Sequence, residues 1–290
     1  MKSSLQSCYR ALLTAAFISI GLSSLQAQTS YYLTASQTDP RQWNTVSHAQ
    51  GWHTLVDDTY VQATAMDATG YYYSNGFNLR TPSGATPFGG ARLTLDATLL
   101  MRNSQSISHL QAVDGATFTV GVNGVMSLTA NLFEQSGTTT YATTVSSRGH
   151  GLIYSTLTGN GTMAFNGFEK ATSFVFNITD ASAYAGTFQF NQGTFSFQQD
   201  LSSAASLAIT ANSVVNLTHG ITTRSLTIGT DTLGAGTYSY SWLNSNYEGI
   251  FTAGSVENGF ITVIPEPSTY SLLAGGVALL ALTRRRRQVS

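Results

Sequence analysis

The sequence predicts an all-β fold, and two features support this prediction. Apolar and polar residues alternate in short runs that are separated by Gly, Asn and Asp, a pattern typical of strands and turns. Only 9% of the 290 residues are charged, against about 25% in an average protein, and Ser, Thr, Asn, Gln and Gly supply the polarity that surface helices take from Glu, Lys and Arg. With 42% hydrophobic residues, the chain can bury a sizeable core.

The first 27 residues predict a removable secretion signal. Lys2 and Arg10 give a positive start, residues 11–25 are apolar, and Ala27 is a small residue at the expected cleavage point. This order is typical of a signal read by Sec-type export machinery, whereas a permanent N-terminal anchor needs a longer apolar span. We therefore expect cleavage after Ala27 and export across the inner membrane.

Residues 28–91 are rich in aromatic side chains and turns, such as Trp43, Trp52 and Tyr71–Tyr73, and show no clean helical period. We expect this region to be an N-terminal cap, because the first turn of a solenoid has an open edge that must be covered.

Residues 92–264 form the predicted body. Strands of about five residues that recur every ten to twenty positions are compatible with a sandwich, a barrel or a solenoid. We expect strands at 92–100, 116–122, 125–133, 162–168, 173–179, 186–199, 206–218, 224–230, 236–243 and 259–264.

The repeat pattern favours the parallel β-helix. A Gly-Thr-aromatic unit begins at Gly186 and again at Gly193, and 206–218 continues the same apolar and polar alternation. In a β-helix, inward apolar residues of one turn stack on those of the next, and Gly and Asn occupy the corners.

The segment 177–195 (NITDASAYAGTFQFNQGTF) resembles the repeats of autotransporter-type passenger β-helices, and this resemblance covers roughly residues 160–264. It implies a solenoid whose last turns span Leu233 to Val263.

The C-terminal 26 residues, 265–290, predict a membrane-sorting tail. Pro265, Glu266 and Pro267 end the body, because prolines continue neither a strand nor a helix. A short apolar helix is expected over residues 268–283, followed by Arg284, Arg285, Arg286 and Arg287. The arginine cluster favours the cytoplasmic side, which leaves the body outside.

These three parts, in this order, resemble the PEP-CTERM sorting signal, a tail also named after ice-binding proteins that carry it. The resemblance implies recognition by an exosortase-type membrane enzyme, transient membrane insertion, removal of the tail, and delivery to the cell surface or a polysaccharide-rich matrix.

Charge and cysteine content exclude several functions. The body carries seven basic and thirteen acidic residues, a net charge of −6, and scattered single cations do not bind nucleic acid. The only cysteine, Cys8, lies in the signal, so the mature chain has no disulfide and no cysteine nucleophile.

The histidines do not have the spacing of a metal site, and no cofactor fingerprint or catalytic motif is present. We therefore expect no metal, cofactor or catalytic site, and surface or turn positions for His48, His53, His109, His150 and His219.

A polysaccharide lyase or glycosidase needs carboxylates and a cation in one groove. We expect the acids to be turn residues, but the alternative rests on Asp96, Asp114, Glu134, Asp180, Asp200 and Asp231, with Arg102, Arg148, Lys170 and Arg224.

Aromatic residues that stack on sugars are a further alternative, carried by Tyr238, Tyr240, Trp242 and Tyr247. Ice binding requires a regular threonine array, and the irregular threonines around Thr117 and Thr119 do not predict one. Of these functions we favour a non-catalytic surface or matrix protein that associates with extracellular polysaccharide.

Overall fold

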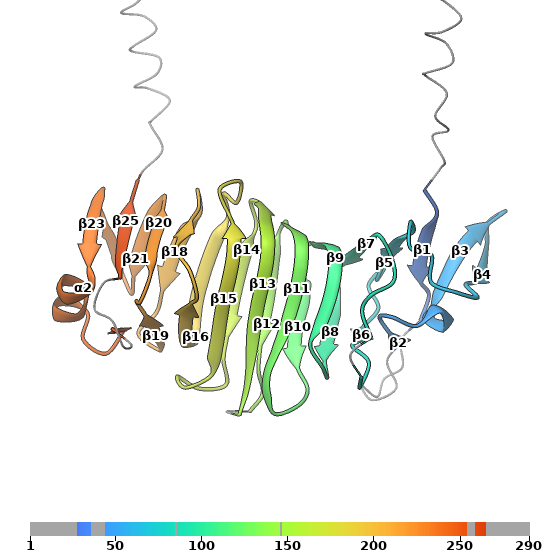
Figure 1. Ribbon diagram of the computed structural model, residues 1–290, viewed down its shortest axis with the longest axis horizontal. Helices are drawn as coiled ribbons and strands as arrows, with labels where there is room; N and C mark the ends of the chain where they lie inside the picture. The colour runs from blue at the N-terminus through green and yellow to red at the C-terminus, as the bar shows by residue number, and fades with distance from the viewer. Residues whose placement is uncertain (1–27, 36–43, 85, 146, 254–258, 265–290) are drawn as a thin grey trace, which may run out of the picture.

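The chain winds as a parallel β-solenoid of about seven turns, as the sequence predicts. Figure 1 shows an elongated body in which the strands of successive turns lie side by side along the long axis. The computed structural model describes residues 28–35, 44–84, 86–145, 147–253 and 259–264. The predicted signal with its cleavage point Ala27 and the predicted sorting tail, including its apolar helix, lie outside these residues.

The first sheet contains the longest strands of the solenoid. Its strands pair in parallel from one turn to the next, except that β3 is antiparallel to both of its neighbours, β1 and β4. In spatial order they are β4 (Thr59–Gln62), β3 (Trp52–Val56), β1 (Ser30–Leu33), β5 (Tyr71–Tyr73), β7 (Arg92–Leu95), β9 (Gln105–Ala112), β11 (Gly124–Gln135), β13 (Arg148–Gly159), β15 (Ser173–Asp180), the second half of β16 (Thr187–Phe197), β19 (Ser213–Asn216) and β24 (Phe251–Thr252).

The second sheet faces the first across the core, and the long strand β16 belongs to both. Its strands are β2 (Asn44–Thr45), β6 (Leu79–Arg80), β8 (Thr98–Met101), β10 (Thr117–Val120), β12 (Thr138–Ala142), β14 (Thr162–Asn166), the first half of β16, β18 (Ser206–Ile209), β21 (Ser225–Ile228) and the antiparallel β22 (Asp231–Leu233).

A smaller third sheet lies in the C-terminal turns. It consists of β17 (Leu201–Ser202), β20 (Gly220–Thr223), β25 (Phe260–Val263) and the antiparallel β23 (Gly236–Ser239).

Inward side chains of successive turns stack in columns because the strands pair in register. In the second sheet, Tyr141 and Phe165 lie 4.9 Å apart between ring centroids. In the first sheet, Phe174 and Phe195 lie 5.1 Å apart with nearly parallel rings. The second-sheet column is Leu79, Leu99, Phe118, Tyr141, Phe165, Phe190, Ile209 and Ile228. All its members are at most 2% exposed, so burial of apolar surface between turns is the main stabilising term.

The corner that precedes the second sheet is built on stacked glycines. The carbonyl oxygen of Gly137 accepts a hydrogen bond from the Thr162 amide (2.7 Å), and that of Gly161 accepts one from the Thr187 amide (3.0 Å). A Cβ atom at Gly161 would lie 2.2 Å from the Gly137 oxygen, and one at Gly186 would lie 1.9 Å from the Gly161 oxygen. Gly161-Thr162 and Gly186-Thr187 are therefore corners, in which glycine permits the close approach and threonine starts the strand. The Gly-Thr unit at Gly193 lies inside β16 instead, at the point where this strand passes from the second sheet to the first.

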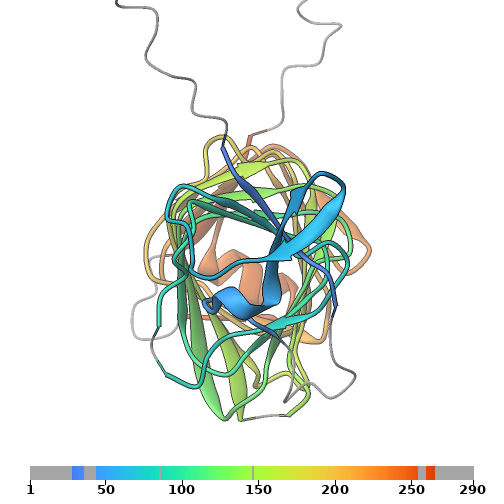
Figure 2. The same ribbon diagram turned by 90° about the vertical axis from the view of Figure 1, so that its right-hand side faces the viewer.

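Both ends of the solenoid are covered. Figure 2 looks along the axis at the N-terminal end, where the β3–β4 hairpin and the short 3-10 helix η2 (Ala49–Gly51) cross the mouth. Trp52 is fully buried there. At the other end, helix α2 (Tyr240–Asn246) covers the last turns (Figure 1).

Two predicted strands are each divided by a corner, and the parallel pairing begins earlier than predicted. Residues 92–100 form β7 and β8, and residues 206–218 form β18 and β19, because the alternation continues through the corner. Parallel pairing begins at β1, which pairs with β5, within the region 28–91 that is predicted as a cap. In that region the hairpin and η2 are the parts that cross the end of the solenoid.

The prediction of a strand over residues 236–243 is wrong in its second half. Strand β23 ends at Ser239, whose Oγ accepts a hydrogen bond from the Trp242 amide (3.3 Å) and caps the helix that follows. Leu243 is fully buried and anchors this helix. Alternating aromatic residues conceal the change from strand to helix in the sequence.

Substitution of Gly186 tests the corner. In Gly186→Ala the new Cβ atom would overlap the Gly161 carbonyl, so we expect the free energy of unfolding to fall by roughly 2 to 3 kcal/mol. Urea denaturation of the full chain measures this. Gly84→Ala is the control, because no atom lies within 4 Å of a Cβ at exposed Gly84. Equal urea midpoints for the two variants would contradict the close approach of Gly186 to the Gly161 carbonyl.

Candidate functional site

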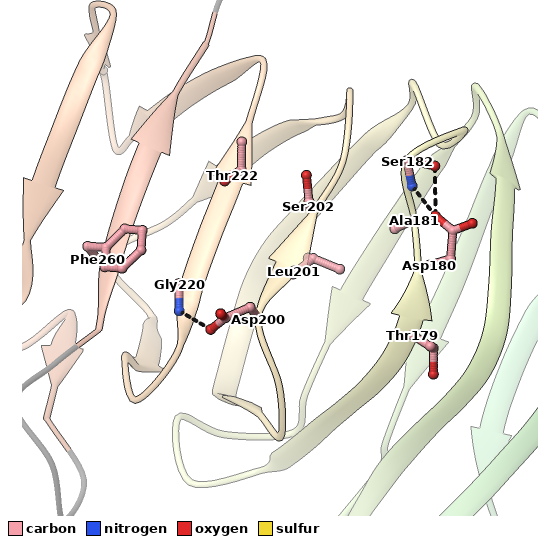
Figure 3. A pocket seen from close by; sticks show the side chains of 10 residues that line it. All are labelled: Thr179, Asp180, Ala181, Ser182, Asp200, Leu201, Ser202, Gly220, Thr222 and Phe260. Carbon is pink, nitrogen blue, oxygen red and sulfur yellow. Dashed lines mark hydrogen bonds between the residues drawn. The ribbon is translucent and has the colours of Figure 1, made fainter.

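An open groove crosses the turns near the C-terminal end of the solenoid (Figure 3). It encloses about 320 Å³ and is lined by residues 179–182, residues 200–202, Gly220, Thr222 and Phe260. The side chain of Phe260 is 39% exposed and offers an apolar surface beside the polar residues. Hydroxyl groups come from Thr179, Ser182, Ser202 and Thr222.

The groove brings together Asp180 and Asp200, two of the acids considered for catalysis. Asp180 Oδ1 accepts hydrogen bonds from the Ser182 amide (2.9 Å) and hydroxyl (2.7 Å), and these bonds lower the pKa of Asp180. Asp200 Oδ1 accepts from the Gly220 amide (2.8 Å). A glycosidase needs a general acid with a raised pKa, and Asp180 has the opposite shift. Both groups are suited to accepting hydrogen bonds from ligand hydroxyls.

Two other candidate acids connect neighbouring turns. Asp96 Oδ1 accepts a hydrogen bond from the Gly76 amide (2.8 Å), and Asp114 Oδ1 accepts one from the Thr138 amide (2.7 Å). Each carboxylate therefore satisfies a backbone donor on an adjacent turn, which is a structural role.

Glu134 pairs with His109 on the outer face of the first sheet. The distance between Glu134 Oε2 and His109 Nε2 is 2.8 Å, and both side chains are partly exposed. Such surface pairs stabilise a fold by about 0 to 1 kcal/mol.

Three of the candidate cations are bound to other parts of the protein, and none of them lines the groove. Arg148 donates to the Val120 carbonyl (3.1 Å), Lys170 to the Gly249 carbonyl (2.9 Å), and Arg224 to the Ser206 hydroxyl (3.3 Å). Arg102 does not line the groove.

The prediction that the histidines are surface or turn residues is wrong for His150. It is 1% exposed and occupies an inward position of β13, where its Nε2 lies 2.9 Å from the Ala142 carbonyl oxygen. Its ring stacks on Phe174 with centroids 5.6 Å apart. Burial lowers the pKa of His150 to about 4, so the imidazole is neutral in the folded protein near pH 7.

The remaining histidines lie at or near the surface. His48 is exposed, His53 Nδ1 lies 3.2 Å from the Thr34 hydroxyl, and His219 Nδ1 lies 3.0 Å from the Thr218 hydroxyl. Among the described residues, no group of three or more His, Cys, Asp or Glu side chains could hold a metal ion.

Three of the four candidate sugar-binding aromatics cluster at the C-terminal end. Trp242 lies 4.9 Å from Tyr238 and 6.3 Å from Tyr247, measured between ring centroids, and is 41% exposed. Tyr247 also donates to Asp231 (3.4 Å). Tyr240 packs against the core. Tyr238, Trp242 and Tyr247 come together because helix α2 changes the direction of the chain, and not because they lie on one face of a strand.

Threonine and serine hydroxyls form columns on the outer face of the second sheet, which differs from the irregular pattern expected from sequence. Thr98, Thr117 and Thr140 are register partners in one column, which continues through Ala164 and Gln189. A second column is Thr138, Thr162, Thr187, Ser206 and Ser225. Both columns are uncharged and rich in hydroxyl groups, but the array of side chains is mixed.

Comparison with known proteins identifies a sorting motif near the C-terminus of the chain. The PEP-CTERM protein-sorting motif matches residues 263–287, which confirms the resemblance seen in the tail. The motif implies export and sorting by an exosortase. No curated protein and no solved structure matches the chain. Within the part of the chain that the structure describes, no helix is long and apolar enough to cross a membrane.

The pKa of His150 predicts a specific loss of stability in acid. Between pH 6.5 and about 4, the unfolded chain binds a proton at this position and the folded chain does not, so stability falls as the pH falls. We expect this site to contribute a loss of roughly 3 kcal/mol by pH 4. In His150→Phe this contribution should vanish, as measured by urea unfolding between pH 7 and 4. The control, His48→Gln, should follow the wild type; identical pH profiles for all three proteins would contradict the assignment.

Proposed function

We propose that the solenoid is a non-catalytic component of the cell surface or extracellular matrix, where it associates with polysaccharide. The observation that carries this proposal is the sorting motif at residues 263–287. It begins within β25, whose last residue, Val263, is buried in the last turn. In this proposal the tail inserts transiently in the membrane before the exosortase releases the body to the surface.

The character of the surface supports this proposal. The hydroxyl columns of the second sheet and the hydroxyl-lined groove present many donors and acceptors but few charges, and polysaccharide is a polymer of hydroxyl groups. Phe260 and Trp242 add exposed aromatic surface that can stack on sugar rings. The structural use of Asp96 and Asp114 leaves few carboxylates for catalysis.

A carbohydrate-active enzyme is the second candidate, and the observation that favours it is the presence of Asp180 and Asp200 in one groove. The lowered pKa of Asp180 counts against a role as general acid. If the groove is catalytic, incubation of the full chain with a panel of polysaccharides gives new reducing or unsaturated ends, and Asp200→Asn abolishes them.

Fractionation of the producing cells tests the proposed role. We expect most of the protein in the surface or matrix fraction, and its release when the exopolysaccharide is removed or digested. Substitution of Pro265 and Pro267 by Ala should leave the protein in the membrane fraction, because the sorting motif is disrupted. A wild-type protein found only free in the medium, with no surface-associated pool, would contradict the proposal.

A further inference from the structure

Four tyrosines lie on the outer face of the first sheet near its N-terminal end. Tyr71 and Tyr73 flank the fully buried Tyr72 in β5, so both point outward. Tyr32 of β1 is the register partner of Tyr73, and their rings stack at 5.3 Å between centroids with an interplanar angle of 17°. Tyr60 of β4 meets Tyr32 edge-on at 6.3 Å and is 49% exposed.

Arg92 adds a cation to this row from the next strand, β7. Its guanidinium lies 4.1 Å from the centroid of the Tyr71 ring, and its Nη2 donates a hydrogen bond to the Tyr73 hydroxyl (2.8 Å). The Nε atom is buried without a hydrogen-bond partner. No carboxylate of the described residues pairs with Arg92. We call Tyr32, Tyr60, Tyr71, Tyr73 and Arg92 the tyrosine platform.

The charge of Arg92 is not neutralised by acids near the platform. Asp67, close in sequence to Tyr71, accepts hydrogen bonds from the amide and hydroxyl of Thr69. Asp96, which follows β7, accepts a hydrogen bond from the Gly76 amide (2.8 Å). Asp57 and Asp58 lie next to Tyr60 in the turn between β3 and β4, and β1 and β5 separate this hairpin from β7. The platform therefore presents a positive group at one end of an aromatic row, on a body whose net charge is −6.

We propose that the tyrosine platform binds an acidic polysaccharide, with sugar rings stacked on the tyrosines and a sugar carboxylate paired with Arg92. Aromatic rings offer flat apolar faces to sugar rings, and guanidinium groups form charge-assisted, bidentate hydrogen bonds with carboxylates. This inference rests on the proposed association with polysaccharide and specifies both the site and the chemical class of the polymer.

Affinity electrophoresis of the full chain in mild detergent tests the proposal, with polygalacturonate as the acidic polymer and dextran as the neutral one. We expect retardation by polygalacturonate that weakens with salt, and little retardation by dextran. Arg92→Gln should weaken binding at least tenfold and Tyr60→Ala at least threefold. Arg92→Lys should be intermediate, because it keeps the charge but loses the planar fork.

Arg102→Gln is the matched control, since it removes the same charge from a partly buried arginine outside the platform, and it should bind like the wild type. Thermal unfolding of each variant shows whether it folds; if Arg92→Gln does not fold, the exposed Tyr60→Ala decides. Equal losses in Arg92→Gln and Arg102→Gln, unchanged binding by Tyr60→Ala, or equal binding of dextran would overturn the proposal. If polygalacturonate is not bound while the protein still fractionates with the exopolysaccharide of the producing cells, this inference fails and the proposed function stands.

Discussion

The close approach of successive turns at the glycine corners is the constraint on which the solenoid depends. At Gly161 and Gly186 there is no room for a side chain between one turn and the carbonyl of the turn before. The amide that follows each glycine donates to that same carbonyl, which sets the register of the strand it begins. Because side chains alternate along a strand, a shift of one residue would turn every inward side chain outward. The corners thus align the aromatic columns in the core and the hydroxyl columns outside.

The fold class and many strands can be predicted from the sequence, because most of the side chains that point into the core are apolar. The strand predicted over 186–199 corresponds to β16, and the Gly-Thr unit at Gly186 marks the corner at its start. The sequence does not predict β9, β12 or β13, whose inward positions include polar or small residues. Thr139 of β12 is an example: it is fully buried, yet its hydroxyl donates a hydrogen bond to Gln135 Oε1 (2.8 Å). Such local partners make a polar residue acceptable in the core and are invisible to a hydrophobicity pattern.

The candidate sites differ in how far sequence could locate them. The sorting motif is contiguous, so its residues can be recognised directly. The groove and the tyrosine platform are built from residues on several turns, and only the register brings them together. Tyr32 and Tyr73 are far apart in the chain, and nothing local distinguishes them from core tyrosines such as Tyr72. The burial of His150 shows the same limit, because its neighbours Phe174 and Tyr141 come from other strands.

Disulfide trapping tests the register most directly. In a Cys8→Ser background, which removes the only cysteine, Thr162→Cys and Thr187→Cys place two thiols on register partners. Neighbouring strands lie about 4.8 Å apart, within the Cα separation that a disulfide spans, so this pair should oxidise readily in the folded protein. Thr162→Cys with Ser206→Cys lies two turns apart, about 10 Å by the same spacing, and should stay reduced. Rapid oxidation of the second pair, or none of the first, would contradict the stacking of turns described for this chain.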